Sequence, residues 1–390
     1  DYANILIDSI NIHINKFKII NDSLNFRIVR LSAKENTGIV LKNLSADFIL
    51  SSRGLYTNNT LLQINNSTID ADFGMEYSNY ESFSYYIDSV YMIGDIRPTI
   101  IDMADIGHFS EILYKMPNKL GVTGNLAGTV RELSGENLKI KYGLNTRLSG
   151  NISFKGLPDF FNSHIIGKNL QVTSSPEDIK SFYLPIAEKH IDVSSIIPNN
   201  EQVTIAGNFD GYYEDFESSM DIILKQGTIN STIEVKNTTS KIDFRTTFVG
   251  NSINVGDFLN QSSIIGSTSF NLAINGIGRT LETIDYKVSG KLTNAEILKY
   301  QYSRLGINGR YYNDSITANL RVGDHNLMMN ASVIANMETT PSFLVNSKIV
   351  LANLNKLNLW SDQNITIATD FNASAVGTDI NTMVADISLR

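Results

Sequence analysis

The side chains that most often perform chemistry are few in this chain and lie far apart. The five histidines are His13, His108, His164, His190 and His325. None of them belongs to an H-E-x-x-H motif or pairs with another at the spacing of zinc ligands, so surface and turn positions explain them. Cysteine is absent, which excludes disulfides, thiolate nucleophiles and cysteine-ligated metals. The sequence therefore predicts no metal site.

Two other short segments contain the residue types of a reactive site. Glu214, Asp215 and Glu217 follow two tyrosines in a predicted hairpin loop, where grouped carboxylates could bind calcium or act as an acid and a base. A solvated turn explains them without a ligand. The G-I-G-R-T segment from Gly276 lacks the lysine of a phosphate-binding loop and lies between predicted strands, so we interpret it as a turn. We predict no catalytic residue, no cofactor and no enzymatic activity.

An aromatic cluster is the remaining candidate for ligand contact. Its members are Tyr77, Tyr80, Phe83, Tyr85, Tyr86 and Tyr91. Such rings could stack on a carbohydrate. However, Tyr85, Ile87 and Tyr91 would share one face of a β-strand, and the strand propensity of aromatic residues explains the cluster without a ligand. We therefore prefer a role in a core or in the lining of a groove.

The composition indicates which elements must position these residues. The chain has 390 residues, of which 42% are hydrophobic and only 18% charged, and its polarity comes mainly from Asn, Ser and Thr. Those residue types suit strands and turns. A formal charge of −8 without a Lys/Arg cluster predicts no nucleic-acid partner. The sequence starts at Asp1 within a strand-like alternating pattern and without a signal sequence, so we expect a fragment of a longer protein.

Apolar and polar residues alternate along most of the chain, which is the period of a β-strand with one apolar face. Leu148, Ile152 and Phe154, for example, occupy even positions between polar neighbours. About twenty such strands joined by tight turns are predicted. Helical patterns are short and lie between strand groups; they cover residues 105–116, 175–189 and 257–261.

A phrase with paired glycines recurs along these strands, beginning at Val122, Thr204 and Phe270. The second glycine of each occurrence is Gly128, Gly211 and Gly276, so the intervals are 83 residues (211 − 128) and 65 residues (276 − 211). Such unequal intervals are typical of an array whose connections vary in length. We therefore predict one continuous repeat segment over 1–390 without a domain boundary. Its approximate repeat groups are 1–120, 121–200, 201–265 and 266–390.

So many strands with so little helix leave few ways to cover the apolar face. Open sheets rarely exceed about ten strands without curling, splitting or flattening. The remaining architectures are a sandwich, closed barrels, a β-solenoid, or a sheet curled into an open gutter that a ligand fills.

A family resemblance favours the gutter. The run E-N-T-G-I-V-L-K-N-L-S-A-D-F from Glu35, the D-M-A-D-I-G-H-F segment from Asp102 and the pattern G-x-x-T-x-L-x-G-x-I-x-x-x-G-L-P-D over 143–159 resemble amino-proximal to middle repeats of TamB-like proteins, of the AsmA-like superfamily. The resemblance implies an all-β fold: an elongated, curled antiparallel β-sheet gutter, or β-groove, with a few short connecting helices.

The resemblance also implies a function and a place in the cell. TamB-like proteins belong to the Gram-negative envelope, are anchored in the inner membrane and cross the periplasm. They are tied to bridge-like transport of phospholipid between the two membranes and to outer-membrane biogenesis. Their partner is an outer-membrane barrel protein of the TamA or BamA type, which regions outside this chain would contact. Membrane contact would likewise involve termini that this chain lacks.

Within such a gutter the alternating apolar residues would shelter acyl chains, at about 25 cal/mol per Å² of apolar area. The predicted lining residues are Phe73, Met75, Leu138, Ile140, Leu148, Ile152, Phe154, Val203, Ile205, Phe209, Ile222, Leu224, Phe270, Leu272, Ile274, Val288, Leu320, Val322, Val345 and Ile349.

Two alternatives to lipid transport remain open. The sheet edges could serve as a scaffold or chaperone for outer-membrane β-barrel assembly by strand addition. A secreted β-solenoid adhesin or polysaccharide-acting enzyme would instead show a uniform short repeat and clustered carboxylates, and the sequence has neither. Four Asp-Ser-aliphatic triplets also match an O-glycosylation pattern of some Gram-negative periplasms; their acceptors would be Ser9, Ser23, Ser89 and Ser315.

Overall fold

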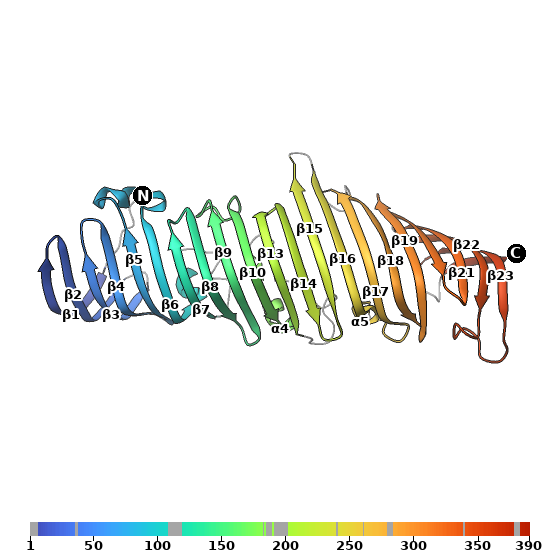
Figure 1. Cartoon of the computed structure of the whole chain (residues 1–390), viewed down its shortest axis with the longest axis horizontal. Coiled ribbons are helices and arrows are strands. Elements are labelled where there is room, and N and C mark those ends of the chain that lie inside the picture. The colour runs from blue at the N-terminus through green and yellow to red at the C-terminus, as the bar shows by residue number, and fades with distance from the viewer. Residues whose placement is uncertain are drawn as a thin grey trace. The chain divides into compact units, whose positions relative to one another are not determined.

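The protein is an all-β chain that divides into two compact units. The computed structural model describes residues 7–35, 38–107, 119–181, 183–184, 189–190, 202–238, 241–259, 261–278, 284–337, 340–377 and 383–390 (Figure 1). Unit 1 comprises Asp1–Ser194 and Asn200–Tyr213, and unit 2 comprises Ser195–Asn199 and Glu214–Arg390. The predicted antiparallel, open-sheet fold with a few short helices is confirmed.

In unit 1 each long strand pairs antiparallel with the next long strand of the chain, as expected where tight turns join alternating segments. The strands are β1 (Ile7–Ile20), β2 (Ser23–Glu35), β3 (Val40–Leu50), β4 (Gly54–Ile64), β5 (Ser67–Glu76), β6 (Tyr91–Asp102), β7 (Lys119–Gly128), β8 (Glu132–Tyr142), β9 (Thr146–Lys155), β10 (His164–Ser174) and β13 (Val203–Tyr212). The short β11 (Tyr183–Leu184) and β12 (Lys189–His190) pair only with each other.

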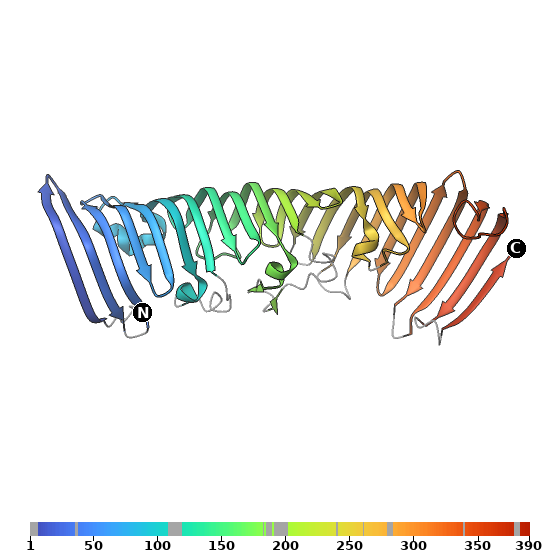
Figure 2. The same ribbon diagram turned by 90° about the horizontal axis from the view of Figure 1, so that it is seen from below.

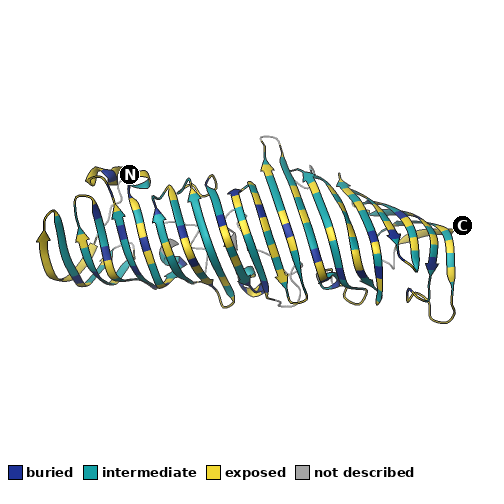
Figure 3. Cartoon of the chain, in the orientation of Figure 1, coloured by how far each residue is buried: buried dark blue, intermediate teal, exposed yellow. Residues whose placement is uncertain are grey.

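Unit 2 repeats the same meander. Its strands are β14 (Asp215–Leu224), β15 (Gly227–Asn237), β16 (Ile242–Asn254), β17 (Ile265–Ile277), β18 (Asp285–Ile297), β19 (Tyr300–Tyr312), β20 (Ser315–Gly323), β21 (Leu327–Asn336), β22 (Ser342–Asn353), β23 (Thr366–Val376) and β24 (Val384–Leu389). One short helix, α5 (Val255–Phe258), follows β16. Buried, half-buried and exposed residues alternate along the strands (Figure 3).

Recurrent β-bulges bend the strands. Asn59, Asn137 and Asn169 each have a positive φ, of 53°, 50° and 52°, inside β4, β8 and β10. In each case the backbone N–H donates to a side chain of the neighbouring strand, such as Asn151 Oδ1 at 2.8 Å from the nitrogen of Asn137. Ser252 in β16 repeats the arrangement with Ser269. Because bulges increase twist and curvature, these positions bend the sheet.

One glycine of that phrase is required by the backbone itself. Gly128 ends β7 with a φ of +128°, and a Cβ there would lie 2.0 Å from the carbonyl oxygen of Glu132. Gly128 therefore permits the tight connection into β8.

The short helices differ in part from the prediction. Unit 1 has η1 (Tyr80–Tyr85), α1 (Tyr86–Ser89), α2 (Met103–Gly107) and α4 (Pro176–Ser181), which flank the strands (Figure 2). The strand predicted through Tyr85 and Ile87 is wrong, because residues 80–89 form η1 and α1; Asn79 Oδ1 caps η1 by accepting the N–H of Glu81. The helix predicted over 105–116 overlaps α2 at residues 105–107, and 108–118 lie outside the described residues. The helix predicted over 175–189 is confirmed only as far as Ser181, because Tyr183–Leu184 and Lys189–His190 form β11 and β12. The helical pattern over 257–261 overlaps α5 at residues 257–258.

Candidate functional site: the apolar face of the sheet

Cross-strand pairing shows which side chains share a face, because residues directly opposite one another on paired strands project to the same side. In unit 1 one such row crosses ten strands. It runs through Phe26, Phe48, Thr57, Phe73, Gly94, Leu126, Gly135, Ile152, Gly167 and Phe209. A parallel row two residues away contains Met75, Met92 and Phe154. These rows form an apolar face.

All ten residues predicted as lining in unit 1 lie on this face. They are Phe73, Met75, Leu138, Ile140, Leu148, Ile152, Phe154, Val203, Ile205 and Phe209. Leu138 and Val203 are buried and the other eight are half-buried, so most of their surface is covered by neighbouring rows while part of it remains accessible.

Unit 2 has an apolar face of the same construction. One row crosses ten strands through Ile222, Ile229, Gly250, Phe270, Leu292, Leu305, Val322, Met329, Ile349 and Thr369. The ten lining residues predicted here also share that face; they are Ile222, Leu224, Phe270, Leu272, Ile274, Val288, Leu320, Val322, Val345 and Ile349. Val322 is buried and the rest are half-buried.

Some glycines on this face make room for the protein's own leucines. A Cβ built on Gly135 would lie 2.6 Å from Leu138 Cδ1, and one built on Gly167 would lie 2.5 Å from Leu170 Cδ1. Both leucines follow a bulge, which swings the side chain back over the glycine three residues earlier. Space at these glycines is therefore filled from within the sheet.

The segment η1–α1 covers part of the apolar face of unit 1. The hydroxyl of Tyr86 donates to the sulfur atoms of Met75 at 3.7 Å and Met92 at 3.3 Å. Asp88 in α1 forms a bidentate ion pair with Arg131, whose guanidinium lowers the pKa of the Asp88 carboxyl. The helical turn is thus tied to the connection between β7 and β8.

At another place on unit 1 the helix α4 is held by Asp178. Burial opposes ionisation of this carboxyl, but hydrogen bonds from the backbone N–H groups of Asn145, Leu144 and Thr146 outweigh it and lower its pKa. The nitrogen of Asn145 lies 2.6 Å from Asp178 Oδ2. The hydroxyl of Tyr142, which lies on the apolar face, donates to the carbonyl of Ser181 in α4.

In unit 2 one part of the apolar face is closed by the protein. We call this the closed patch; it consists of Ala295, Tyr302, Leu305, Val322, Ala352 and Leu357. Leu357 follows β22 in residues 354–361 and is 0% exposed. Asn358 Nδ2 donates to the carbonyl of Leu298 at 2.9 Å, which holds this segment across the sheet.

Asp324 supports the closed patch from the turn after β20. Burial opposes its ionisation, but donation from the Tyr300 hydroxyl at 2.6 Å and from the backbone N–H groups of Asn326 and Ser303 lowers its pKa to about 2. The carboxylate thereby fixes Tyr300, whose ring lies against Tyr302 of the closed patch with centroids 4.7 Å apart.

A second part of the same face is open. We call it the apolar hollow; it has a volume of about 380 Å³ and exposes no polar atom in its lining. Its lining residues are Ile229, Ile253, Val255, Leu259, Ile265, Thr268, Phe270, Leu272, Leu292, Ala295 and Ile297. Phe270 and Leu272 were predicted from the sequence as lining residues. Ile253 and Leu292 were missed, because each lies next to a bulge that breaks the alternation.

The residues considered for chemistry lie apart from both regions. His164 Nε2 is 2.9 Å from Asp210 Oδ1, and Glu214 accepts a hydrogen bond from Asn237. Among the residues that the structure describes, no group of three or more His, Asp or Glu side chains could hold a metal ion. His108 lies outside the described residues. None of the described helices is long and apolar enough to cross a membrane.

The four serines of the Asp-Ser triplets lie at strand or helix ends or within β1. Ser9 and Ser89 are exposed, and Ser23 and Ser315 are half-buried.

Comparison with known proteins gives no match: none of the family models, curated proteins or solved structures searched is significantly similar to this chain.

Proposed function

We propose that this chain carries lipids non-enzymatically, by sheltering acyl chains on the apolar face of its sheet. The observation that supports the proposal is the apolar hollow, a concave site that exposes no polar atom and lies on a face of half-buried aliphatic side chains. Enzyme sites combine apolar walls with a few convergent polar groups. An entirely apolar, open site suits a hydrocarbon chain.

The size of the apolar hollow is compatible with this ligand. A methylene group is similar in size to a water molecule, whose share of liquid volume is about 30 Å³. The hollow of about 380 Å³ therefore has room for roughly a dozen carbon atoms. Each buried methylene contributes about 0.8 kcal/mol, so a chain of this length would gain several kcal/mol even after the cost of ordering it.

The wider setting of the proposal follows from the resemblance to TamB-like proteins. In that setting the chain is part of a periplasmic bridge for phospholipid between the inner and outer membrane, linked to outer-membrane biogenesis, and a barrel protein of the TamA or BamA type is its partner through regions outside this chain. The open, half-buried face supports this setting because sliding lipids need a lining without fixed polar contacts.

Lipid retention tests the proposal. The chain is purified without detergent from cells, and bound lipid is measured by native mass spectrometry and by extraction. We expect lipid with the wild-type chain, less than a tenth as much with Leu272→Glu in the apolar hollow, and wild-type amounts with Ala273→Glu on the opposite face of the same strand. Absence of lipid from the wild-type chain, or equal loss in both variants, would contradict lipid carriage.

A second candidate function is a scaffold for outer-membrane strands, and strand β1 favours it. All fourteen residues of β1 are exposed, including Ile10, Phe17 and Ile19 at 61%, 62% and 73%. Among the described strands β1 pairs with β2 alone, so in this chain a partner strand could add to its other edge. A proline at an outward-facing β1 position would then abolish binding of a barrel-strand peptide, whereas it would leave lipid retention unchanged.

A further inference from the structure

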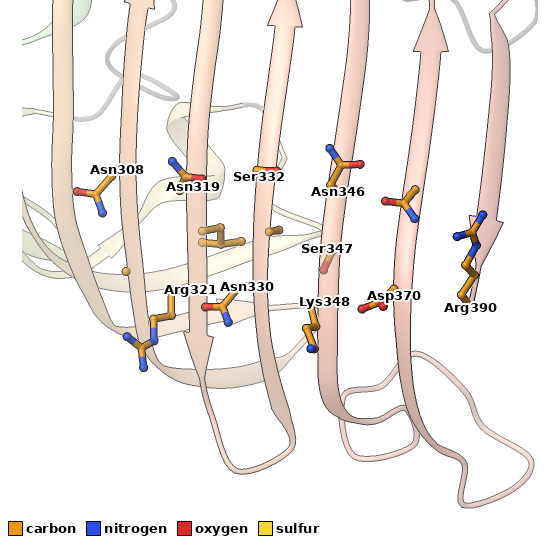
Figure 4. Close-up of a pocket in the computed structure, with 14 residues that line it drawn as sticks. Asn308, Asn319, Arg321, Asn330, Ser332, Asn346, Ser347, Lys348, Asp370 and Arg390 are labelled. Atoms are coloured by element: carbon orange, nitrogen blue, oxygen red, sulfur yellow. The ribbon is translucent and has the colours of Figure 1, made fainter.

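Unit 2 has a second hollow, on the polar face of the sheet. It has a volume of about 680 Å³ and is lined by residues of strands β19 to β23 together with Arg390 (Figure 4). We call it the polar hollow. Most of its lining residues project to the face opposite the apolar side chains of the same strands, while Leu320, Ala331 and Ser347 of its lining belong to the apolar face.

A row of short polar side chains crosses the polar hollow. Direct pairing aligns Asn308, Asn319, Ser332, Asn346 and Asn372 on five successive strands. Neighbouring strands lie about 4.8 Å apart, so the row repeats at this interval. None of the four carboxamides has a hydrogen bond to another side chain in the described part of the chain. Each is free to donate and to accept.

Three cations flank this row without a partner. Arg321, Lys348 and Arg390 line the polar hollow and form no ion pair with any described residue, and Asp370 is the single carboxylate of the lining. Elsewhere on the polar face of unit 2, Arg310 pairs with Asp285 at 2.8 Å and Lys236 with Glu234 at 2.6 Å, whereas Lys287 and Lys291 of β18 form no ion pair with a described residue. The chain as a whole carries a formal charge of −8, whereas the lining of the polar hollow holds three cations and one carboxylate.

We propose that the polar hollow binds an anionic oligosaccharide that lies across the strands. A sugar chain presents hydroxyl groups that both donate and accept, which matches a row of carboxamides, and its length per pyranose unit is close to the strand spacing of about 4.8 Å. Carboxylate or other acidic groups on the sugar would pair with Arg321 and Lys348 by charge-assisted hydrogen bonds. No aromatic ring lines the hollow, so stacked bases are not the matching ligand.

Binding is tested with a hexamer of galacturonic acid as the probe and its methyl ester, the uncharged form of the same chain, as the comparison. Isothermal titration calorimetry on the full chain is expected to show binding of the acid, weaker binding of the ester by about tenfold or more, and loss of affinity as salt rises. The double variant Arg321→Gln and Lys348→Gln should lower affinity for the acid by about tenfold and leave affinity for the ester unchanged.

A matched control removes two positive charges outside the polar hollow. Lys287→Gln with Lys356→Gln changes the net charge equally and should retain wild-type affinity for the acid. Asn319→Ala with Asn346→Ala should weaken binding of both acid and ester. The proposal would be overturned if the wild-type chain did not bind the acid or bound acid and ester equally. It would also be overturned if the Arg321→Gln, Lys348→Gln variant and the Lys287→Gln, Lys356→Gln control lost the same affinity for the acid. Lipid retention by all these variants should equal that of the wild type.

Discussion

The closed patch and the apolar hollow of unit 2 lie on the same face and adjoin at Ala295, yet only one of them is filled by the protein itself. Over the closed patch, Leu357 supplies the aliphatic group that removes the face from water. Over the apolar hollow, Val255 of α5 and the residue Leu259 that follows the helix lie in the lining, and Leu259 remains 56% exposed. The same strand chemistry therefore stabilises the fold at the closed patch and leaves an open apolar surface at the apolar hollow.

This difference separates two energetic roles. Side chains in a covered region contribute mainly to folding, because their neighbours are already fixed. Side chains in an open region gain part of their free energy of burial only when a ligand binds. Substitutions in the two regions should thus affect different measurements.

The largest effect is expected from Leu357→Ala in the closed patch. Removing a fully buried leucine from a packed core should lower the free energy of unfolding by about 3 kcal/mol. Urea denaturation of the chain, followed by a signal from unit 2, measures this free energy. The control Leu359→Ala, at an exposed position of the same segment, should change the free energy of unfolding by less than about 0.5 kcal/mol. Equal effects of the two variants would mean that Leu357 does not close the patch.

The next effect concerns the support of the closed patch by Asp324. Its pKa is lowered from 3.8 to about 2, which corresponds to about 2 kcal/mol of stability at neutral pH. Because the folded-state pKa is the lower one, this contribution is present above about 3.8 and is lost as the pH falls through about 2. Asp324→Asn should therefore be less stable at pH 7 and converge with the wild type near pH 2.

The control for that measurement is Asp386→Asn, at an exposed position of β24. Its stability should follow the wild-type pH profile throughout. A constant difference between Asp324→Asn and the wild type from pH 2 to pH 7 would show that the carboxylate does not act through its ionised form.

In the apolar hollow a substitution should reduce lipid retention more than it reduces the stability of the fold. Leu272→Glu is expected to lower lipid retention at least tenfold, because an ionised carboxylate near an acyl chain must lose its water. The half-buried position lets the carboxylate reach solvent, so the free energy of unfolding should fall by less than in Leu357→Ala. A larger loss of stability than of lipid would indicate that the hollow is a core in this protein.

The smallest effect is expected from the ion pair that ties α1 to the sheet in unit 1. Asp88 and Arg131 are both exposed, and exposed pairs contribute little to global stability. Asp88→Asn should leave the urea midpoint unchanged but raise amide hydrogen exchange in residues 80–90 by about threefold. Unchanged exchange there would show that the ion pair does not hold the segment over Met75 and Met92.

Alternation along single strands was enough to predict an all-β fold and the face of all twenty lining residues, whereas the family resemblance favoured an open sheet over a sandwich, closed barrels or a solenoid. Alternation was enough because side-chain direction in a strand has a period of two and does not depend on distant contacts. The role of these residues in contacting lipid remains a prediction. The bulge residues were not foreseen, since a positive φ at Asn137 depends on an acceptor, Asn151, that lies on another strand.

The covering segments could not be predicted for a related reason. Leu357 follows β22 in a polar stretch, and only the folded sheet brings it over Leu305 and Val322. The aromatic cluster was assigned to a strand from its propensity, whereas packing of Tyr77 on Phe83, with ring centroids 4.9 Å apart, accompanies a helical turn. Tertiary contacts outweigh local propensity at both places.

Photochemical labelling tests the central claim, that the apolar hollow shelters acyl chains, most directly. A fatty acid with a diazirine on its chain is bound to the wild-type protein, irradiated, and the labelled peptides are mapped by mass spectrometry. We predict labelling at residues 255–259 and 265–272 of the apolar hollow and little at residues 354–361 over the closed patch. Equal labelling of residues 354–361, or of the polar face around Asn319 and Asn346, would contradict the account.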